Sequence, residues 1–258
     1  MEHSVLYKQD YSQSRVQYLF KNNRGRDFIC GDIHGCFDLL EEQLQKVNFD
    51  PQQDRLFSVG DIIDRGYDSA KALFYLEQDW FYCIRGNHEQ MFLDWCNEDT
   101  PVFRADAFRF HMHNGGQWVA DYLGVHIQQL NDDILNDKPI TEKYPALDLW
   151  VKALSALPFA MEIKSSRKKI GIIHAEIPQE VKWPSLEAEL NKPRVLYSLL
   201  YSRKYIHSLK PKKYSISGVD EIYAGHTILD KPQKIGNIHY IDTGAYSRNQ
   251  LTLVKISN

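Results

Sequence analysis

The sequence predicts an α/β fold in which helices cover a mixed β-sheet. Short apolar runs rich in β-forming residues alternate with segments whose apolar residues recur at helical spacing, which is typical of a layered α/β domain. The apolar runs do not alternate with polar residues, so their strands are expected to be buried on both faces. Near the C-terminus, two strand-like runs follow each other without a helix-length pattern between them, which favours a mixed sheet over a purely parallel one.

The regular elements begin at residue 27 and continue to the C-terminus. The first three strands are predicted over 28–30, 56–59 and 81–84. Each of them precedes a helical pattern, carried in turn by Phe37, Leu40, Leu44 and Val47, by Ala72, Leu73 and Leu76, and by Met91, Phe92 and Trp95. A helix is predicted over 146–156, and further strands are predicted over 170–173, 222–224, 238–241 and 251–256.

The domain organisation follows from where the alternation of strands and helices begins and where it is interrupted. Residues 1–26 are polar and irregular, so we expect an N-terminal extension followed by a single domain over 27–258. Residues 97–145 interrupt the strand–helix units with a Gly115-Gly116 pair, an acidic stretch and Pro139. Since connections of this length are usually functional, we predict an insertion that caps the functional site.

Composition excludes several classes of protein. The 31 basic and 34 acidic residues give a net charge of −3, which provides no global attraction to nucleic acid or anionic membranes. No apolar run approaches the roughly 18 residues of a membrane span, and the first 15 residues lack a signal-peptide core. The four cysteines form no C-x-x-C motif. We therefore expect a cytoplasmic protein with neither nucleic acid nor membrane as partner, and its oligomeric state stays open.

Residues able to bind a metal follow five of the predicted strands. Two lie in the run G-D-I-H-G at 31–35, one in G-D-I-I-D-R-G at 60–66, one in R-G-N-H-E at 85–89, and two directly after later strands. Ligands of layered α/β proteins bind beyond the carboxyl ends of the strands, so these side chains are expected to share one edge. They are Asp32, His34, Asp61, Asn87, His174 and His226.

The types of these side chains indicate a pair of divalent cations. Carboxylate, imidazole and amide oxygen, with no thiolate, suit hard to borderline ions such as Mn²⁺, Fe²⁺, Mg²⁺ or Zn²⁺. Six ligands exceed what one ion takes from protein while it keeps a position for water, whereas two ions sharing a carboxylate use all six. Two ions roughly 3.5–4 Å apart serve in-line displacement at phosphorus, with water losing a proton near neutral pH.

The three motifs resemble the signature blocks of the PPP-type serine/threonine protein phosphatases, and most closely those of the bacteriophage lambda and enterobacterial protein phosphatases. The likeness extends from residue 27 to the C-terminus and is weak only across 97–145. It implies a calcineurin-like metallophosphoesterase fold, in which two packed mixed β-sheets are flanked by helices in αββα layers. It also makes 27–258 a single metallophosphoesterase catalytic domain.

The resemblance implies a role for each candidate ligand. The metal centre would hold two divalent ions, with manganese as the first choice and iron, zinc or magnesium as alternatives. Asn87 would also contact the substrate. The first ion would be held by Asp32 and His34, the bridge would be Asp61, and the second ion would be held by Asn87, His174 and His226.

The resemblance also implies an acid. His88 would protonate the leaving oxygen, and Asp64 would orient it. An imidazole suits this task because its pKa lies near the working pH, and a neighbouring carboxylate favours the protonated form.

Arginines would bind the phosphoryl group. Arg65 and Arg203 would hold its oxygens through forked donors, which lysine cannot reproduce. The assignment of Arg203 depends on aligning the segment 201–203, and Arg194 and Lys204 are its alternatives. Arg85 precedes the Asn–His pair and would line the same wall.

Some residues have two interpretations at this stage. Glu89 is either an orienting group or an acidic residue in the first turn of a helix. Glu176 stands where many relatives place Gly or Asp, and it would either repel a phosphate dianion or attract a basic substrate flank. Tyr246 lies at the rim of the site or in an exposed loop. His111 and His113 are predicted not to bind metal, because nothing places a third ligand beside them.

The predicted function is removal of phosphate from serine or threonine, with tyrosine as a further candidate, in phosphoproteins or phosphopeptides by direct in-line attack of water. The alternative is hydrolysis of dinucleoside polyphosphates such as diadenosine tetraphosphate on the same scaffold. Relatives with that activity tend to lack an acid equivalent to Asp64 and to carry Asp where Glu89 stands, so both residues favour the phosphatase. A non-catalytic phosphoprotein-binding module would be expected to lack the acid or a ligand, and none is missing.

Overall fold

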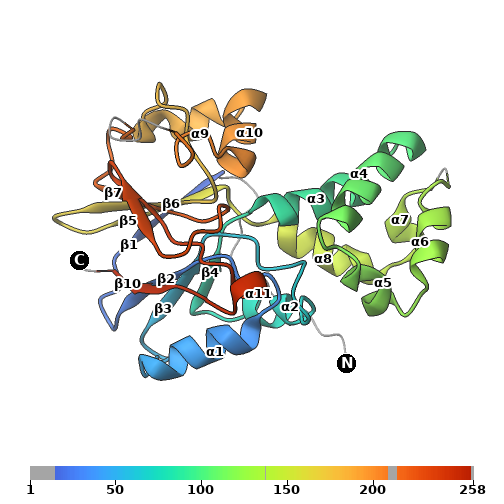
Figure 1. The fold of residues 1–258 in the computed structure, drawn as a ribbon, viewed down its shortest axis with the longest axis horizontal. Coiled ribbons are helices and arrows are strands. Elements are labelled where there is room, and N and C mark those ends of the chain that lie inside the picture. The colour runs from blue at the N-terminus through green and yellow to red at the C-terminus, as the bar shows by residue number, and fades with distance from the viewer. Residues whose placement is uncertain (1–14, 137, 209–213, 257–258) are drawn as a thin grey trace.

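Two mixed β-sheets lie at the centre of the molecule (Figure 1). The computed structural model describes residues 15–136, 138–208 and 214–256. The four-stranded sheet has the order β10 (Leu253–Lys255), β2 (Asp27–Cys30), β3 (Arg55–Ser58) and β4 (Phe81–Cys83). The six-stranded sheet has the order β1 (Val16–Phe20), β5 (Ala160–Lys164), β6 (Lys169–Ile173), β7 (Glu221–Ala224), β9 (Ile238–Tyr240) and β8 (Gln233–Ile235).

The pairing of the strands brings the ends of several strands to common edges. In the four-stranded sheet β2, β3 and β4 are parallel, and β10 runs antiparallel to β2. In the six-stranded sheet β6, β7 and β9 are parallel, β5 pairs antiparallel with β6 and parallel with β1, and β8 pairs antiparallel with β9. The prediction of mixed sheets is confirmed, and the polar segments that follow the parallel strands leave each sheet at its carboxyl edge.

A layer of buried apolar side chains lies between the two sheets. One buried cluster combines apolar side chains from both, including Ile29 and Phe57 of the four-stranded sheet and Met161 and Ile172 of the six-stranded sheet. Strands packed between a second sheet and a layer of helices are buried on both faces. This packing explains the runs without apolar/polar alternation in the sequence.

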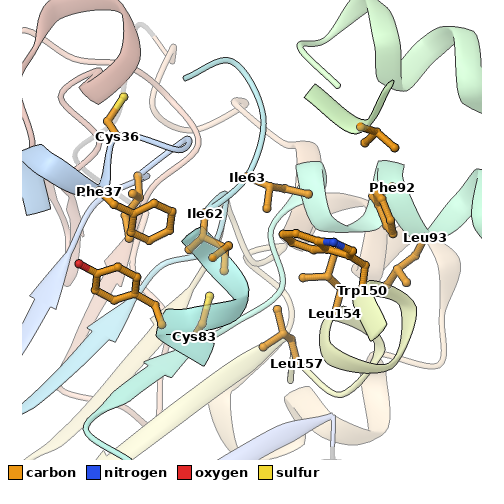
Figure 2. Close-up of a cluster of buried hydrophobic side chains, with 14 of the residues drawn as sticks. Cys36, Phe37, Ile62, Ile63, Cys83, Phe92, Leu93, Trp150, Leu154 and Leu157 are labelled. Atoms are coloured by element: carbon orange, nitrogen blue, oxygen red, sulfur yellow. The ribbon is translucent and has the colours of Figure 1, made fainter. Parts of the chain in front are cut away.

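Helices cover the outer faces of both sheets and complete the predicted αββα layers. The four-stranded sheet is covered by α1 (Phe37–Lys46), α2 (Lys71–Leu76), α3 (Asn87–Cys96) and α8 (Ala146–Ser155), and the six-stranded sheet by η1 (Trp183–Ser185), α9 (Leu186–Glu189) and α10 (Pro193–Tyr201). Figure 2 shows the core beside the four-stranded sheet, where Phe37 and Ile62 lie near the sheet and Phe92 and Trp150 lie between helices. A last helix, α11, spans Ala245–Arg248.

The predicted insertion is helical and extends to one side of the sheets (Figure 1). It contains α4 (Pro101–His113), α5 (Trp118–Leu123), α6 (Ile127–Asp133) and α7 (Ile140–Lys143). The fully buried Arg104 ties its two ends together, because its guanidinium donates to carbonyl oxygens of Glu98 and Asp99 before α4 and of Asn136 and Lys138 after α6. The apolar side chains of 97–145 join the same buried cluster as those of α3, α8 and the four-stranded sheet.

Three strands escaped the sequence analysis. Strand β1 lies in the segment expected to be irregular, where Val16 is buried and Phe20 is exposed, as at the edge of a sheet. Strand β5 was missed because Glu162 interrupts its apolar run, and this carboxylate accepts a hydrogen bond from the indole of Trp183 at 2.8 Å. Strand β8 is short and polar. Residues 1–14 of the predicted extension lie outside the described residues.

None of the helices in the described part of the chain combines the length and the apolar character that crossing a membrane requires.

Candidate active site

Several non-glycine residues in the segments after the parallel strands have positive φ angles, which are uncommon. Among the described residues, seven non-glycine residues have positive φ angles, and five of these are predicted site residues. Such conformations cost roughly 1–3 kcal/mol each and persist where the surrounding structure imposes them, most often at functional sites. The five are His34, Asp61, Asp64, Arg65 and His226, with φ between 48° and 71°.

Backbone hydrogen bonds join the segment after β2 to the segment after β3, and the side chain of Glu89 joins the segment after β3 to the segment after β4. The amides of Ile33 and His34 both donate to the carbonyl of Asp61, at 3.1 and 2.8 Å. The buried carboxylate of Glu89 accepts from the amides of Asp61, Ile62 and Gly86 at 2.8–2.9 Å. Glu89 therefore orients the loop that carries Asp61. Of the two interpretations of Glu89, this contact favours the orienting group over a mere acidic residue in the first turn of a helix. Burial and the neighbouring Asp61 raise the pKa of Glu89 to about 7.

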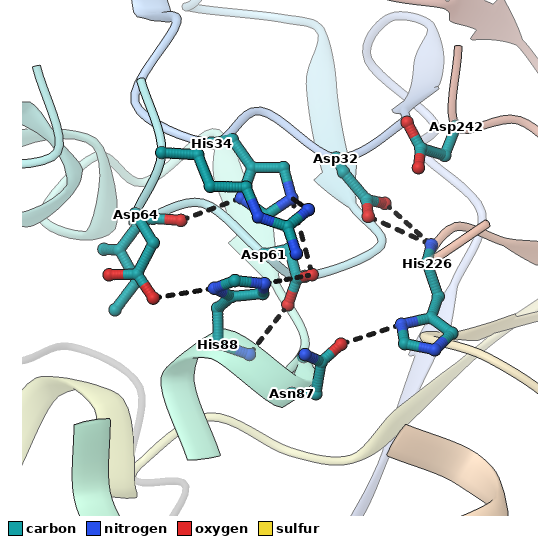
Figure 3. Close-up of polar contacts among 12 residues, drawn as sticks. Asp32, His34, Asp61, Asp64, Asn87, His88, His226 and Asp242 are labelled. Carbon is teal, nitrogen blue, oxygen red and sulfur yellow. Dashed lines mark hydrogen bonds and ion pairs between the residues drawn. The ribbon is translucent and has the colours of Figure 1, made fainter. Parts of the chain in front are cut away.

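Asp61 lies at the centre of the site (Figure 3). Its Oδ2 is 3.6 Å from Nε2 of His34, 3.4 Å from Nε2 of His174 and 3.8 Å from Nε2 of His88. Its Oδ1 accepts the backbone N–H of His88 at 3.0 Å. Burial favours the neutral acid, but the surrounding imidazoles outweigh it and lower the pKa of Asp61. A carboxylate oxygen this close to three ring nitrogens has the position that a bridging ligand requires.

Two groups of metal-binding atoms share this carboxylate. In each group the ligand atoms lie within 4.8 Å of one another. One group contains His34, Asp61 and His88, and the other contains Asp61, His174 and His226. The amide oxygen of Asn87 joins the second group, at 2.8 Å from both Nε2 of His174 and Nδ1 of His226.

The protonation of the ring nitrogens indicates that these donors suit a cation. His34 and His174 donate their Nδ1 protons to the carbonyls of Ile63 and Val59, at 3.0 and 2.8 Å. Burial lowers the pKa of both rings, that of His34 to about 3, so each is neutral and its Nε2 carries a lone pair. The lone pair of His174 consequently faces the Asn87 oxygen, and a cation bound between two such donors would relieve this contact.

Asp32 occupies a neighbouring position. Its carboxylate accepts the backbone N–H of His226 at 3.0 and 3.2 Å, and it is not a member of either group of ligand atoms. Burial and the charges of Asp242 and Asp61 raise its pKa well above the usual range. A Cβ on Gly225 would lie 1.9 Å from Asp32 Oδ1, so this approach requires glycine. Sequence reasoning missed Asp242, although the D-T-G-A run after β9 was a signal.

A buried histidine–carboxylate pair stands beside the bridge. His88 Nδ1 donates to Asp64 Oδ2 at 2.7 Å, and both side chains are 0% exposed. Its Nε2 is buried without a hydrogen-bond partner. Burial opposes protonation, but the carboxylates of Asp61 and Asp64 outweigh it and raise the pKa of His88. The ring is thus prepared to carry a proton and to donate it from Nε2.

The insertion completes the environment of Asp64, and sequence reasoning missed this contribution. His111 Nε2 lies 2.9–3.0 Å from both carboxylate oxygens of Asp64, and Trp118 Nε1 donates to Oδ1 at 2.7 Å. His111 is buried, whereas His113 is exposed. His111 and His113 are absent from both metal-binding groups, and His111 has a role that its spacing did not reveal.

Arg65 is held between the insertion and α11. Its amide donates to the carbonyl of Gly115 at 3.1 Å, and its Nη1 lies 3.2 Å from Nε2 of His34. The guanidinium carbon lies 4.9 Å from the ring centroid of Tyr246, and this ring also packs edge-on against His34 at 5.1 Å. Tyr246 is 38% exposed, so it lies at the rim of the site, as one of its two interpretations held.

Of the three candidates for the second phosphoryl-binding side chain, Arg203 has a contact at the site. Arg203 donates to the carbonyl of His226 at 3.3 Å, which places it beside the second ligand group. Its alternatives lie elsewhere, because Arg194 pairs with Glu180 and Lys204 lies over the ring of Tyr205.

The contacts of Arg85 differ from those predicted. Its guanidinium donates to the Gln90 side chain and to the Ser155 carbonyl, at 3.1 and 2.6 Å, and it lies 4.7 Å from the ring centroid of Phe159. These contacts indicate that Arg85 supports the junction of α3 and α8 rather than the substrate wall, because Nη1 and Nη2 donate to groups of those two helices.

Glu176 has neither of the two roles considered for it. It is fully buried, and its carboxylate accepts from Ser202 Oγ at 2.6 Å and from the amides of Tyr205 and Ile206 at 2.9 Å. These donors flank Arg203 on both sides. Glu176 therefore organises the loop that carries Arg203, and its charge is satisfied inside the protein.

The matching family model defines the class of protein. The calcineurin-like phosphoesterase model matches residues 28–228, so this chain belongs to that family. The family implies divalent metal ions, and the histidine and aspartate groups around Asp61 have the composition to hold them.

The chain is also similar to individual proteins of known name. Serine/threonine-protein phosphatase 1 of Salmonella typhimurium is 35% identical over 229 residues, covering 89% of this chain and 91% of the relative. The symmetrical bis(5'-nucleosyl)-tetraphosphatase of Pseudomonas fluorescens is 37% identical over only 84 residues, 32% of this chain and 30% of that enzyme. The solved cold-active protein-tyrosine phosphatase of a Shewanella species shares the fold, with a TM-score of 0.60 and 16% identity over 96% of this chain and 78% of that structure.

Proposed function

We propose that this chain is a metal-dependent phosphomonoesterase that removes phosphate from serine and threonine residues of proteins. The observation that carries the proposal is the buried His88–Asp64 pair, in which His88 Nε2 lies 3.8 Å from the carboxylate shared by the two groups of ligand atoms. An acid beside a bridging carboxylate suits cleavage of an alkyl phosphate, whose leaving oxygen needs a proton. The phosphatase of Salmonella typhimurium, similar over almost its whole length, supports the same substrate class.

Two divalent ions are part of this proposal, with manganese as the expected metal and iron, zinc or magnesium as the other candidates. When bound, they supply Lewis acidity that activates water and neutralises phosphoryl charge. His34 and Asp61 would hold the first ion, with Asp32 as a further ligand. Asn87, His174 and His226 would hold the second together with Asp61.

The chain's own groups would bind the substrate and move the proton. Arg65 and Arg203 would bind the phosphoryl oxygens from opposite sides, with Asn87 as a further contact. As a water oxygen forms its bond to phosphorus, the bond to the seryl or threonyl oxygen breaks. His88 Nε2 gives its proton to that oxygen, and Asp64 stabilises the ring while it carries the proton. The products are a free hydroxyl side chain and inorganic phosphate.

The proposed catalytic unit spans 27–258, and β1 (Val16–Phe20) adds an edge strand to its six-stranded sheet. A cytoplasmic location fits its four free cysteines, all of which are buried. Residues 97–145 belong to this unit, because they supply contacts to both Asp64 and Arg65.

A side-by-side assay tests the substrate class. The purified chain with added Mn²⁺ is given a phosphoserine peptide, a matched phosphotyrosine peptide and diadenosine tetraphosphate at equal concentrations. The proposal predicts the highest kcat/KM for the phosphoserine peptide. A preference for diadenosine tetraphosphate would reverse the assignment, and a preference for phosphotyrosine would move it to a different protein substrate. Repeating the assay with Fe²⁺, Zn²⁺ and Mg²⁺ ranks the metals.

A further inference from the structure

We propose that His111, carried by the helical insertion, is a positioning residue for the acid His88 and acts through the carboxylate of Asp64. This inference rests on the proposed function, since it concerns the proton that His88 would donate. It also gives part of the insertion a task in the reaction. Residues 97–145 were the portion of the chain where the sequence motifs were weakest.

The carboxylate of Asp64 is saturated by three side-chain donors. Oδ2 accepts from His88 Nδ1 at 2.7 Å and lies 2.9 Å from His111 Nε2, while Oδ1 accepts from Trp118 Nε1 at 2.7 Å and lies 3.0 Å from the same His111 nitrogen. Asp64 is completely buried, so no solvent can replace a lost donor. The orientation of Oδ2 toward His88 thus depends on donors that hold the other directions.

The orientation of His111 is itself fixed. Its Nδ1 accepts the indole proton of Trp95 at 3.0 Å, which leaves the ring proton on Nε2, facing Asp64. A Cβ on Gly116 would lie 2.5 Å from the His111 ring, so the glycine allows the backbone after α4 to close over it. Trp95 therefore donates to His111 and His111 donates to Asp64, while His88 donates to the same carboxylate, so Asp64 is the common acceptor of both histidines.

The chemical consequence depends on the leaving group. Without the His111 donor, one direction of a buried carboxylate is unsatisfied, and Asp64 holds the His88 proton less well in line with the substrate. An alkyl oxygen leaves only with a proton, whereas an aryl oxygen such as that of p-nitrophenyl phosphate leaves readily without one. A loss of positioning should therefore slow phosphoserine hydrolysis more than aryl phosphate hydrolysis, while a general disturbance of the site should slow both equally.

Two amide substitutions differing by one methylene test the inference. His111→Gln can extend its amide N–H to Asp64, and His111→Asn cannot. We expect H111N to lower kcat on a phosphoserine peptide about 10–100-fold, with a much smaller loss on p-nitrophenyl phosphate, and H111Q to recover most of it. His113→Asn, an exposed histidine on the same helix, is the matched control and should behave as the parent. His111→Phe provides a second loss variant if H111N is unstable.

A spectroscopic readout separates this inference from the proposed function. The short His88 Nδ1–H···Asp64 bond predicts a low-field proton resonance in the parent, in H113N and in H111Q, which moves or disappears in H111N. Equal losses on both phosphates in a folded H111N, or an unchanged resonance and unchanged kcat, would overturn the role of His111. A parent that hydrolyses neither phosphate contradicts the proposed function, and the resonance still decides whether His111 positions the pair.

Discussion

The two sides of the site use the same residue type in opposite ways. On the side of the ligand groups, His34 and His174 direct Nδ1 to backbone carbonyls, and burial lowers the pKa of both rings. On the side of the insertion, His88 directs Nδ1 to the carboxylate of Asp64, and its pKa is raised. All three rings are buried, and all three direct Nε2 toward Asp61.

The difference teaches that the partner of Nδ1 sets the task of each ring. A neutral carbonyl fixes the tautomer and stabilises the charged ring less than burial disfavours it, so Nε2 offers a lone pair to a cation. A carboxylate stabilises the imidazolium, so Nε2 offers a proton. Burial favours the neutral form of all three rings, and at His88 the carboxylates of Asp61 and Asp64 together outweigh it.

The largest expected effects come from replacing one ring on each side. His174→Asn removes a metal ligand, so we expect bound metal and activity on every phosphate to fall together. His88→Asn removes the acid, so we expect a loss of about 10²–10⁴-fold on phosphoserine peptide, a smaller loss on p-nitrophenyl phosphate, and unchanged metal content. Elemental analysis and steady-state kinetics of both variants make the comparison. An H88N variant as fast as its parent on phosphoserine would remove the distinction between the two sides.

The ligand side was predictable from sequence because its residues follow strands at short, fixed spacing. The motifs at 31–35, 60–66 and 85–89 placed His34, Asp61 and Asn87 at one edge before any geometry was known. The acid side was predictable only as far as Asp64. His111 and Trp118 reach it from helices whose packing no local pattern encodes, and Arg85 was misplaced because a position next to a motif does not fix where a long side chain points.

Glu176 and β5 also have partners that are distant in the sequence and that no local pattern predicts. A carboxylate two residues from a ligand was expected to act on substrate, yet its partners come from the loop 202–206, far along the chain. The strand at 160–164 was hidden because a buried glutamate in it is paired with Trp183. In both cases a buried charge satisfied by a distant donor contradicts the expectation that local composition gives.

A smaller effect is expected in the pH dependence of stability of the metal-free protein. His34 has a folded pKa of about 3, below its unfolded value of about 6.5, so the unfolded chain takes up its proton first and stability falls as the pH drops through this window. His88 has a raised folded pKa, so its contribution is present below about 6.5 and is lost as the pH rises through the folded value.

Replacing each ring with glutamine should therefore change the slope in opposite directions. Urea unfolding between pH 7 and 5 should show a shallower loss of stability in H34Q, by up to about 1.4 kcal/mol per pH unit, and a steeper loss in H88Q. The parent in chelator is the control for both. Slopes that change in the same direction would contradict the proposed charge states of the two rings.

The smallest effect is expected at the substrate-binding loop. Glu176→Gln keeps the shape of the side chain but removes the charge that accepts the amides of Tyr205 and Ile206. Because Arg203 lies in that loop, we expect KM for a phosphopeptide to rise several-fold with little change in kcat. Glu180→Gln, at an exposed ion pair with Arg194, serves as the control. A fall in kcat at constant KM would show that Glu176 acts on the reacting groups instead.

An anomalous-scattering map of crystals grown with Mn²⁺ tests the central claim most directly, namely that carbonyl-bonded rings bind metal and the carboxylate-bonded ring carries the proton. The account predicts two peaks with Asp61 between them, one within roughly 2.3 Å of His34 Nε2 and one equally close to a nitrogen of His174. It also predicts that His88 Nε2 stands outside bonding distance of both. A peak bonded to His88 Nε2 would contradict the account, because a ring that binds metal there cannot donate that proton.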